Sequence, residues 1–445
     1  MTFASLSRRM ALLAAVSGSV LMAACGGGGG GGDNGTTYVR AINLTSDLPS
    51  LDEYTGDTKR FSALAANVMS DTISFEANTY TVNIKRAGEG TSLLTGSYAL
   101  SKDKHFTAVL WGRETSLHLS TLPEDENTAD IAAGNTRVRM FNATTDTGTL
   151  DIYLTAATAN LSDTAVTQGA LGSGVLSGFR DISAGTYRLR VTGEKNPNDV
   201  RLDIPAVTLG SQKYGTLVIT AGAGGVLVNG TLIRQQDTAT SLKNGRARVR
   251  LAAGVNGAAS VSATVGGLTV SGAVASPRVG GYVLVNAGTA DVTVRVNGAL
   301  ASTTSQLFAE GGDYTVLSYG TAAAPSVTLL ADDNRLPSTT SRAKLRLVNG
   351  VAGAGPLTLS LDYQPLQPSD IDVGAASTYY AADSSSASRI EISSLTATAP
   401  LLTQTGSTTD KLLLSQGIYS VFMLGGAVNP ITAAQVPTGV FRRDR

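Results

Sequence analysis

One segment of this chain recurs without a gap, and this repeat limits the folds that the chain can adopt. Seven residues return 99 positions later in the same order and register. The matched pairs are Arg40 and Arg139, Asn43 and Asn142, Thr45 and Thr144, Asp47 and Asp146, Leu51 and Leu150, Asp52 and Asp151, and Tyr54 and Tyr153. Weaker copies of the opening segment begin at Arg248 and Lys344. A period of about 100 residues is the size of one small domain, so the repeat predicts four tandem modules.

Each module opens on a segment with the alternation of a β-strand. Val138 and Met140 share one face with Asn142, whereas Arg137 and Arg139 point to the other face. The same alternation of apolar and cationic residues recurs at 248–251 and 344–347. We expect the apolar face to line a core and the cations to lie in solvent, where they keep strands from pairing with other chains. The alternative is that the cations bind an anionic polymer such as a lipopolysaccharide core.

Short strands about ten residues apart, separated by Gly, Asn, Asp and Ser, predict an all-β chain of tandem antiparallel, immunoglobulin-like β-sandwiches. The predicted modules span residues 37–129, 130–236, 237–336 and 337–445. Polar clusters separate them. The first cluster, at residues 124–127, lacks the spacing of an EF-hand, so we expect a solvated linker there and no calcium loop.

The N-terminal residues have the pattern of an export signal followed by a tether. Arg8 and Arg9 precede an apolar run over residues 10–24, which is too short to span a bilayer. Cys25 follows this run and is the only cysteine in the chain. Seven consecutive glycines come next, so residues 25–36 are expected to form a flexible tether.

The residues before Cys25, Met22-Ala23-Ala24, resemble the lipobox of bacterial lipoproteins. This resemblance implies removal of residues 1–24, attachment of acyl chains such as palmitate at Cys25, and stable membrane anchoring. Gly26 is not the Asp that commonly retains lipoproteins in the inner membrane, so the outer membrane is the expected location, on its periplasmic or surface face. Both general secretion and twin-arginine export remain open.

Charge gives little indication of a nucleic-acid partner. The chain has 34 basic and 34 acidic residues, and removal of the signal takes away two of the basic ones. A slightly acidic protein is not expected to bind nucleic acid. The expected partners are therefore the membrane, through the lipid anchor, and a glycan or other surface polymer.

The residues that usually carry catalysis are sparse. The two histidines, His105 and His118, both lie in the first module, which excludes a His-rich metal site and a repeated His-based mechanism. Ser341 and Lys344 fit an S-x-x-K pattern, but the pattern needs a helix and this segment leads into a strand. We predict no catalytic, cofactor-binding or metal-binding residue.

Two pairs of acids are the remaining candidates for chemistry. Asp47 with Asp52, and Asp146 with Asp151, could hold calcium or serve as an acid and base pair. The interpretation that we favour is structural, because Asp in a turn accepts hydrogen bonds from its own backbone.

Three features together resemble a known bacterial family: the opening strand, the Leu-Asp-x-Tyr element at 51–54 and 150–153, and the Ala-Gly-Thr-Tyr turn at 184–187. The family is domain of unknown function 4397. Thr358 and Ser360 replace the Asp and Tyr in the fourth module. The resemblance implies an exported β-sandwich, often repeated and often lipid-anchored, with no established activity.

We therefore expect a non-enzymatic, lipid-anchored protein of the cell envelope. Its tandem modules would act in adhesion, in envelope scaffolding or in binding a polymeric glycan, because serial weak sites add avidity. The alternatives are a glycan hydrolase that uses paired carboxylates and a passive surface spacer.

Overall fold

The structure is a computed structural model that describes residues 35–366, 370–384, 389–407, 412–413, 416–426 and 436–445. Within these residues the protein is all-β, as expected, and its only helices are two short 3-10 turns, η1 (Thr128–Asp130) and η2 (Leu161–Asp163). None of the described residues belongs to a helix that is long and apolar enough to cross a membrane. The predicted export signal, Cys25 and the glycine run lie outside the described residues.

The strands form four β-sandwiches in chain order, and each sandwich contains two sheets. Sandwich 1 contains β1 (Thr36–Thr45), β2 (Ser50–Thr55), β3 (Thr58–Ala65), β4 (Ile73–Glu76), β5 (Thr79–Arg86), β6 (Ser92–Ala99), β7 (His105–Arg113) and β8 (Ser116–Pro123). Sandwich 2 contains β9 (Asn135–Ala143), β10 (Leu150–Thr155), β11 (Gln168–Leu171), β12 (Arg180–Ser183), β13 (Gly185–Gly193), β14 (Asn196–Leu209), β15 (Tyr214–Ala221), β16 (Val228–Arg234) and β17 (Ala239–Leu242).

The other two sandwiches repeat this plan. Sandwich 3 contains β18 (Arg246–Val255), β19 (Ser260–Val265), β20 (Leu268–Ala275), β21 (Arg278–Val279), β22 (Val283–Asn286), β23 (Gly288–Val296), β24 (Ala299–Phe308), β25 (Asp313–Gly320) and β26 (Pro325–Asp332). Sandwich 4 contains β27 (Arg342–Gly350), β28 (Leu357–Leu361), β29 (Gln364–Pro365), β30 (Tyr380–Asp383), β31 (Arg389–Ser394), β32 (Leu402–Thr405), β33 (Ile418–Leu424) and β34 (Thr438–Arg443).

The opening strand of each sandwich lies inside a sheet. In sandwich 1 the sheet order is β4-β1-β7-β8, and the second sheet is β3-β2-β5-β6. All neighbours are antiparallel except β1 and β7, which run parallel from Tyr38 opposite His105 to Thr45 opposite Gly112. The same parallel contact joins β9 to β15, β18 to β25 and β27 to β33. The predicted antiparallel sandwich is confirmed, and each copy adds one parallel strand pair.

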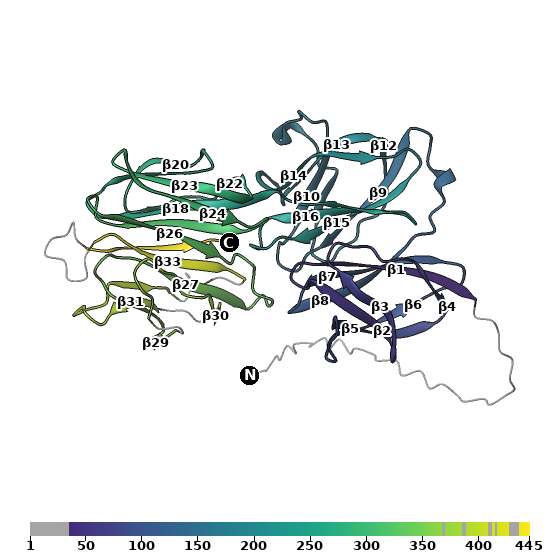
Figure 1. Cartoon of the computed structure of the whole chain (residues 1–445), viewed down its shortest axis with the longest axis horizontal. Helices are drawn as coiled ribbons and strands as arrows, with labels where there is room; N and C mark the ends of the chain where they lie inside the picture. Colours follow the sequence, from purple (N-terminus) through teal and green to yellow (C-terminus); the bar gives the residue numbers. More distant parts are fainter. Residues whose placement is uncertain (1–34, 367–369, 385–388, 408–411, 414–415, 427–435) are drawn as a thin grey trace, which may run out of the picture.

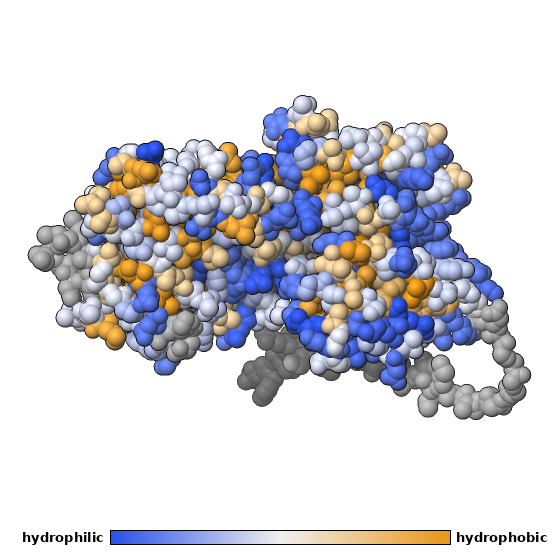
Figure 2. All heavy atoms as spheres, in the orientation of Figure 1, coloured by the Kyte–Doolittle hydropathy of each residue, from blue (hydrophilic) through white to orange (hydrophobic). Residues whose placement is uncertain are grey.

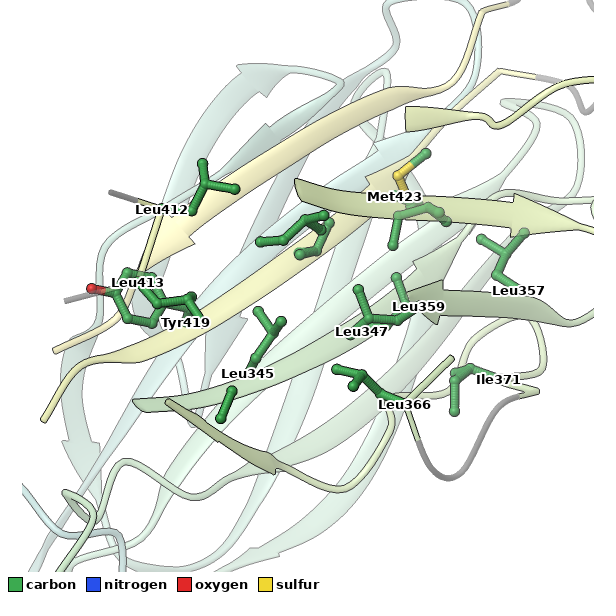
Figure 3. Close-up of a cluster of buried hydrophobic side chains, with 14 of the residues drawn as sticks. Leu345, Leu347, Leu357, Leu359, Leu366, Ile371, Leu412, Leu413, Tyr419 and Met423 are labelled. Atoms are coloured by element: carbon green, nitrogen blue, oxygen red, sulfur yellow. The ribbon is translucent and has the colours of Figure 1, made fainter. Parts of the chain in front are cut away.

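The core of each sandwich lies between its two sheets. In sandwich 4, Leu345 and Leu347 of β27 face Leu357 and Leu359 of β28, and Met423 of β33 joins them (Figure 3). All five side chains are buried. The alternation predicted for the opening strands is therefore correct on the core side.

The recurring Asn of the repeat ties the opening strand to the second sheet. Asn43 Nδ2 donates to the carbonyl oxygens of Leu48 at 3.0 Å and Leu64 at 3.2 Å. Asn142 Nδ2 donates to Gly148 O and Leu171 O in the same way. A buried amide must find hydrogen-bond partners, and these two find theirs in carbonyl groups of the second sheet and of the loop that leads to it.

The outer faces of the opening strands are also covered. Ile42, Leu44 and Trp111 of sandwich 1 form one apolar cluster with Phe141 and Val218 of sandwich 2. A second such cluster joins sandwiches 3 and 4 and contains Ala252, Leu317, Val348, Phe422 and Leu424. The chain is thus two pairs of sandwiches, and Figure 1 shows the first pair and the second pair as the two halves of the molecule.

Backbone contacts join the two pairs. The loop after β15 reaches sandwich 3, where Gly224 N–H donates to Gly311 O at 2.8 Å, and Asn334 N–H donates back to Gly224 O at 3.0 Å. A Cβ on Gly224 would lie 2.8 Å from the Gly311 carbonyl oxygen, so glycine permits this approach.

Candidate functional site

One arginine in each opening strand is buried at the contact between two sandwiches, which we call the seam of the pair. The exposed fraction is 6% for Arg40, 7% for Arg139, 0% for Arg250 and 1% for Arg346. The prediction that these cations lie in solvent is wrong, because the outer face of each opening strand packs against the neighbouring sandwich. Their guanidinium groups are likewise not displayed for an anionic polymer.

In the first pair, Arg40 joins sandwich 1 to sandwich 2. Its Nε donates to Thr107 Oγ1 at 3.0 Å, and its Nη2 lies 2.6 Å from Glu124 Oε1 and 2.8 Å from Arg234 O. Glu124 is only 5% exposed. The expected solvated linker at 124–127 is therefore wrong at Glu124, whose carboxylate neutralises the buried cation.

Arg139 makes the reciprocal contact from sandwich 2. Its Nε donates to Thr216 Oγ1 at 3.0 Å and its Nη2 donates to Pro123 O of sandwich 1 at 3.2 Å. Its guanidinium lies 4.5 Å from the ring centroid of Phe179. The two sandwiches thus contribute equivalent arginines to the seam, and each arginine bonds a threonine of its own sandwich and a carbonyl oxygen of the other.

The second pair has the same plan with more charge. Arg250 Nε donates to Thr315 Oγ1 at 2.9 Å and lies 3.7 Å from Asp332 Oδ2, and its Nη2 donates to Asp444 Oδ2 at 3.1 Å. Arg346 forms an ion pair with the other oxygen of Asp332. Burial acts to raise the pKa of Asp332, but the two guanidinium groups outweigh it and hold the pKa below its ordinary value.

Aromatic rings cover these guanidinium groups. Arg250 lies 4.5 Å from the ring centroid of Tyr282 and 5.0 Å from that of Phe422, and Arg346 lies 4.7 Å from that of Tyr379. A cation over a ring face gains electrostatic attraction that strengthens when water is excluded. The rings therefore help to cover the buried cations of the second seam.

Two adjoining hollows lie between the two pairs and form what we call the junction groove. The first hollow has a volume of about 320 Å³ and the second about 450 Å³. The first is lined by Arg113, Thr115, Ser116, Thr145, Asp146, Asp333, Arg335, Leu336, Ser338 and Lys344. Asp333 and Arg335 line both hollows, and Tyr379 lines the second.

Ion pairs hold the acids of the junction groove. Asp333 Oδ1 lies 2.7 Å from Arg335 Nε, and its Oδ2 lies 2.8 Å from Lys344 Nζ. Burial acts to raise the pKa of Asp333, but these two cations lower it to about 2. Burial lowers the pKa of Lys344. Across the groove, Arg113 Nε lies 2.8 Å from Asp146 Oδ2.

The groove also contains polar groups that make no hydrogen bond with any residue that the structure describes. The hydroxyls of Thr115, Thr145 and Ser338 make no hydrogen bond within the described part of the chain. Asp146 is 5% exposed, and its Oδ1 has no hydrogen-bond partner among the described residues. A groove with unused donors and acceptors can bind a polar ligand rich in hydroxyl groups.

The two acid pairs of the repeat take up separate structural contacts. Asp52 Oδ1 accepts the N–H of Ala63 at 2.7 Å, and Asp151 Oδ1 accepts that of Ala170 at 2.8 Å. Both alanines have positive φ, 48° and 49°, so each Asp stabilises a strained bulge. Asp47 Oδ1 instead accepts the N–H of Glu114. Among the described residues, no group of three or more His, Cys, Asp or Glu could hold a metal ion.

The other sequence candidates lie apart from one another. His105 Nδ1 is 2.8 Å from Asp125 Oδ1, and its ring stacks on Tyr38. The ring of His118 stacks on Trp111 at 4.3 Å. Lys344 Nζ pairs with Asp333, and no contact with the Ser341 hydroxyl is present in the described residues.

Sequence reasoning did not find the seam residues Asp332 and Asp444 or the junction groove. One signal was present for the seams. The opening strands are apolar on both faces, as in the consecutive pairs Ala41-Ile42 and Leu347-Val348, and a strand that is buried on both sides has this pattern. No local signal marks the groove, because its residues come from all four sandwiches and from the linker between sandwiches 3 and 4.

One comparison with known proteins follows the pairing of the sandwiches. A family model described as "Domain of unknown function (DUF4397)" matches residues 37–153 and 247–360, just over half of the chain. Each match begins in the first strand of a pair and ends in the second strand of its second sandwich. No curated protein matches the sequence.

One solved structure with partial similarity is a family 26 carbohydrate-binding module from Eubacterium rectale Amy13K, crystallised with maltoheptaose. The two sequences are 14% identical, and the match covers 43% of this chain and 95% of that chain, with a TM-score of 0.14. At so low a TM-score, the match says nothing about what this chain binds.

Proposed function

Because the chain belongs to the family described as domain of unknown function (DUF4397), which has no assigned activity, we propose a function from its geometry. The protein is a lipid-anchored, non-enzymatic component of the cell envelope. Its paired sandwiches form a rigid scaffold, and the junction groove binds a hydroxyl-rich polymer such as a glycan. Adhesion or envelope scaffolding follows from such binding when many copies share one surface.

The anchor rests on the sequence before Cys25. A basic start, a short apolar run and a single cysteine after small residues favour lipid attachment at that thiol. Several acyl chains hold a protein stably where one chain does not. The glycine run after Cys25 supplies the reach that a scaffold needs to stand clear of the bilayer.

The ligand proposal depends on one observation, which is the unused polar lining of the junction groove. Three hydroxyls without a hydrogen bond in the described residues surround a hollow of about 320 Å³, close to the lower end of ordinary ligand sites at about 300 Å³. The cations Arg113, Arg335 and Lys344 outnumber the acids Asp146 and Asp333 there. The groove therefore suits a polyhydroxyl ligand that is neutral or weakly anionic.

The same groove disfavours a carboxylate-dependent glycan hydrolase. Such an enzyme needs one acid with a raised pKa beside an ionised one. Both acids that line the 320 Å³ hollow are paired with cations, and the pKa of Asp333 is lowered to about 2. An acid with so low a pKa cannot donate a proton near neutral pH.

The test is direct binding of residues 35–445 to lipopolysaccharide and to a panel of immobilised neutral bacterial polysaccharides. Ser338→Trp fills the groove and is expected to weaken binding at least tenfold. The matched control is Ser271→Trp on the far edge of sandwich 3, which should bind normally. If no polysaccharide binds, the passive spacer is the better account, and release of new reducing ends would favour the hydrolase.

A further inference from the structure

Strand β24 forms an open edge of sandwich 3. The sheet order there is β20-β19-β23-β24, and β24 (Ala299–Phe308) pairs only with β23 along its whole length. No strand of the described residues lies on its other side. The outward backbone N–H and C=O groups of this ten-residue strand are thus available to another strand.

This edge lacks charge and proline, two of the features that normally prevent strands of different molecules from pairing. The sequence of β24, ALASTTSQLF, contains no charged residue and no proline. Leu300 is 59% exposed and Leu307 is 70% exposed. Edge strand β3 carries Lys59 and Arg60, whereas the uncharged edge strands β6 and β20 are shorter than β24, with eight residues each. A long, uncharged edge with exposed leucines is a site of strand pairing.

The two leucines lie on the same face of the sheet. Leu300 is opposite Arg295 and Leu307 is opposite Thr289, and both partners are exposed residues of β23. Residues seven positions apart in a regular strand point to opposite faces. The register shift between Val294 and Arg295 inserts one extra residue in β24, and this bulge brings Leu300 and Leu307 to the same face. Figure 2 shows separate apolar patches on the visible surface of both halves of the molecule, this half included.

We propose that β24 pairs with β24 of a second copy of this chain, antiparallel and about a two-fold axis near Thr304. In that arrangement Leu300 of each copy lies beside Leu307 of the other on one face, and both apolar side chains leave water. We infer a second copy as the partner because β24 carries no charge. It therefore offers no opposite charge that would attract a charged partner, and pairing with itself brings no like charges together. The pairing is independent of the ligand proposed for the junction groove.

A single strand pair buries less than the roughly 1,200 Å² of a stable interface, so the dimer is weak in dilute solution. Copies held on one membrane surface would associate more readily, because anchoring raises their effective concentration. A weak interface of this kind would join scaffolds side by side.

Sedimentation velocity of residues 35–445 over a concentration series tests the proposal. The native sequence should show reversible dimerisation. Ser305→Lys, which adds a charge at the centre of β24, should raise the dissociation constant at least tenfold. Thr269→Lys adds the same charge at the opposite edge, β20, and should leave it unchanged. Monomer at all concentrations, or equal effects of the two substitutions, would overturn the β24 pairing.

Cysteine cross-linking gives a second readout. Residues 35–445 contain no cysteine. Thr304→Cys places one thiol near the two-fold axis, where directly opposed residues of antiparallel strands are about 4.5–5.5 Å apart between Cα atoms, within disulfide range. Mild oxidation should give a covalent dimer, whereas Ser262→Cys, on the interior strand β19, should stay monomeric. Failure of Thr304→Cys to cross-link in a sample that sediments as a dimer would contradict this register.

Discussion

Arg250 Nε and Asp332 Oδ2 lie 3.7 Å apart, and neither side chain is exposed to water. Arg346 of sandwich 4 shares the same carboxylate, so Asp332 neutralises one cation from each side of the seam. Removal of one member of a buried ion pair leaves an uncompensated charge, which costs far more than the intact pair contributes. The seam of the second pair therefore depends on Asp332.

We predict that Asp332→Asn lowers the free energy of unfolding of the second pair by about 3–5 kcal/mol. Guanidinium denaturation followed by circular dichroism measures the change. The control is Asp383→Asn, which breaks the exposed pair with Arg342 and should cost less than about 1 kcal/mol. Equal, small effects of the two substitutions would show that the seam does not need the charge.

The first pair has its own reporter. Trp111 is the only tryptophan in the chain, is 6% exposed, and meets the ring of Phe141 across the first seam at 5.4 Å between centroids. Phe141→Ala should destabilise the first pair by about 3–5 kcal/mol and shift Trp111 emission to longer wavelength. Asp332→Asn lies in the second pair and should leave Trp111 emission unchanged. A shift in both variants would mean that a change in the second pair alters the structure of the first.

Glu53 should make the stability of sandwich 1 depend on pH. Burial raises the pKa of Glu53 from 4.5 to about 7, although the Tyr98 hydroxyl, 2.6 Å from Oε1, opposes the rise. Between these pH values the unfolded chain has lost the proton and the folded chain keeps it, so stability falls as pH rises. The contribution is fully present below pH 4.5 and lost above about 7.

The expected loss across that interval is about 3 kcal/mol. Urea denaturation at pH 4.5, 6 and 8, followed by Trp111 fluorescence, measures it in the native sequence. Glu53→Gln keeps an acceptor for Tyr98 but cannot ionise, so its stability should vary less over the same range. An identical pH profile for both proteins would assign the dependence to other groups.

Asp52 should be important for stability but not for ligand binding. Its carboxylate accepts the N–H groups of Ala63 and Gly88 and the Nζ of Lys59. We expect Asp52→Ala to cost about 1–3 kcal/mol, because three donors lose a shared acceptor that is itself buried. Asp57→Ala, at an exposed position of the same sandwich, is the control in thermal melts. Loss of polysaccharide binding by folded Asp52→Ala would point to a functional role instead.

Cys25→Ser tests the anchor. The variant should incorporate no labelled palmitate and should leave the membrane fraction or remain unprocessed, because the serine hydroxyl does not accept the thioether-linked lipid. Ser17→Ala, which alters the apolar run but not the cysteine, should be labelled normally. Normal labelling and retention of Cys25→Ser would contradict lipid attachment at this residue.

The sequence predicts most of the fold because the core positions follow a local rule. Alternation at Val138 and Met140 identifies an inward strand face, and the repeat transfers this assignment along the chain. The parallel contact of β1 with β7 could not be predicted, since alternation gives no strand direction. Arg250 was misplaced for a related reason. A cation on the face opposite the core normally indicates solvent, whereas here the partner sandwich covers Arg250 and the carboxylates of Asp332 and Asp444 neutralise it.

Double burial of the opening strands decides where this chain can be divided. A fragment that ends near residue 129 would expose an apolar patch to solvent, and such a patch favours aggregation. The patch would contain Ile42, Leu44, Val109 and Trp111. Division between β17 and β18, at residues 243–245, leaves each such patch covered. A pair of sandwiches is thus the smallest unit that keeps its apolar faces covered. Gene duplication, domain shuffling and recombinant truncation should therefore act on whole pairs.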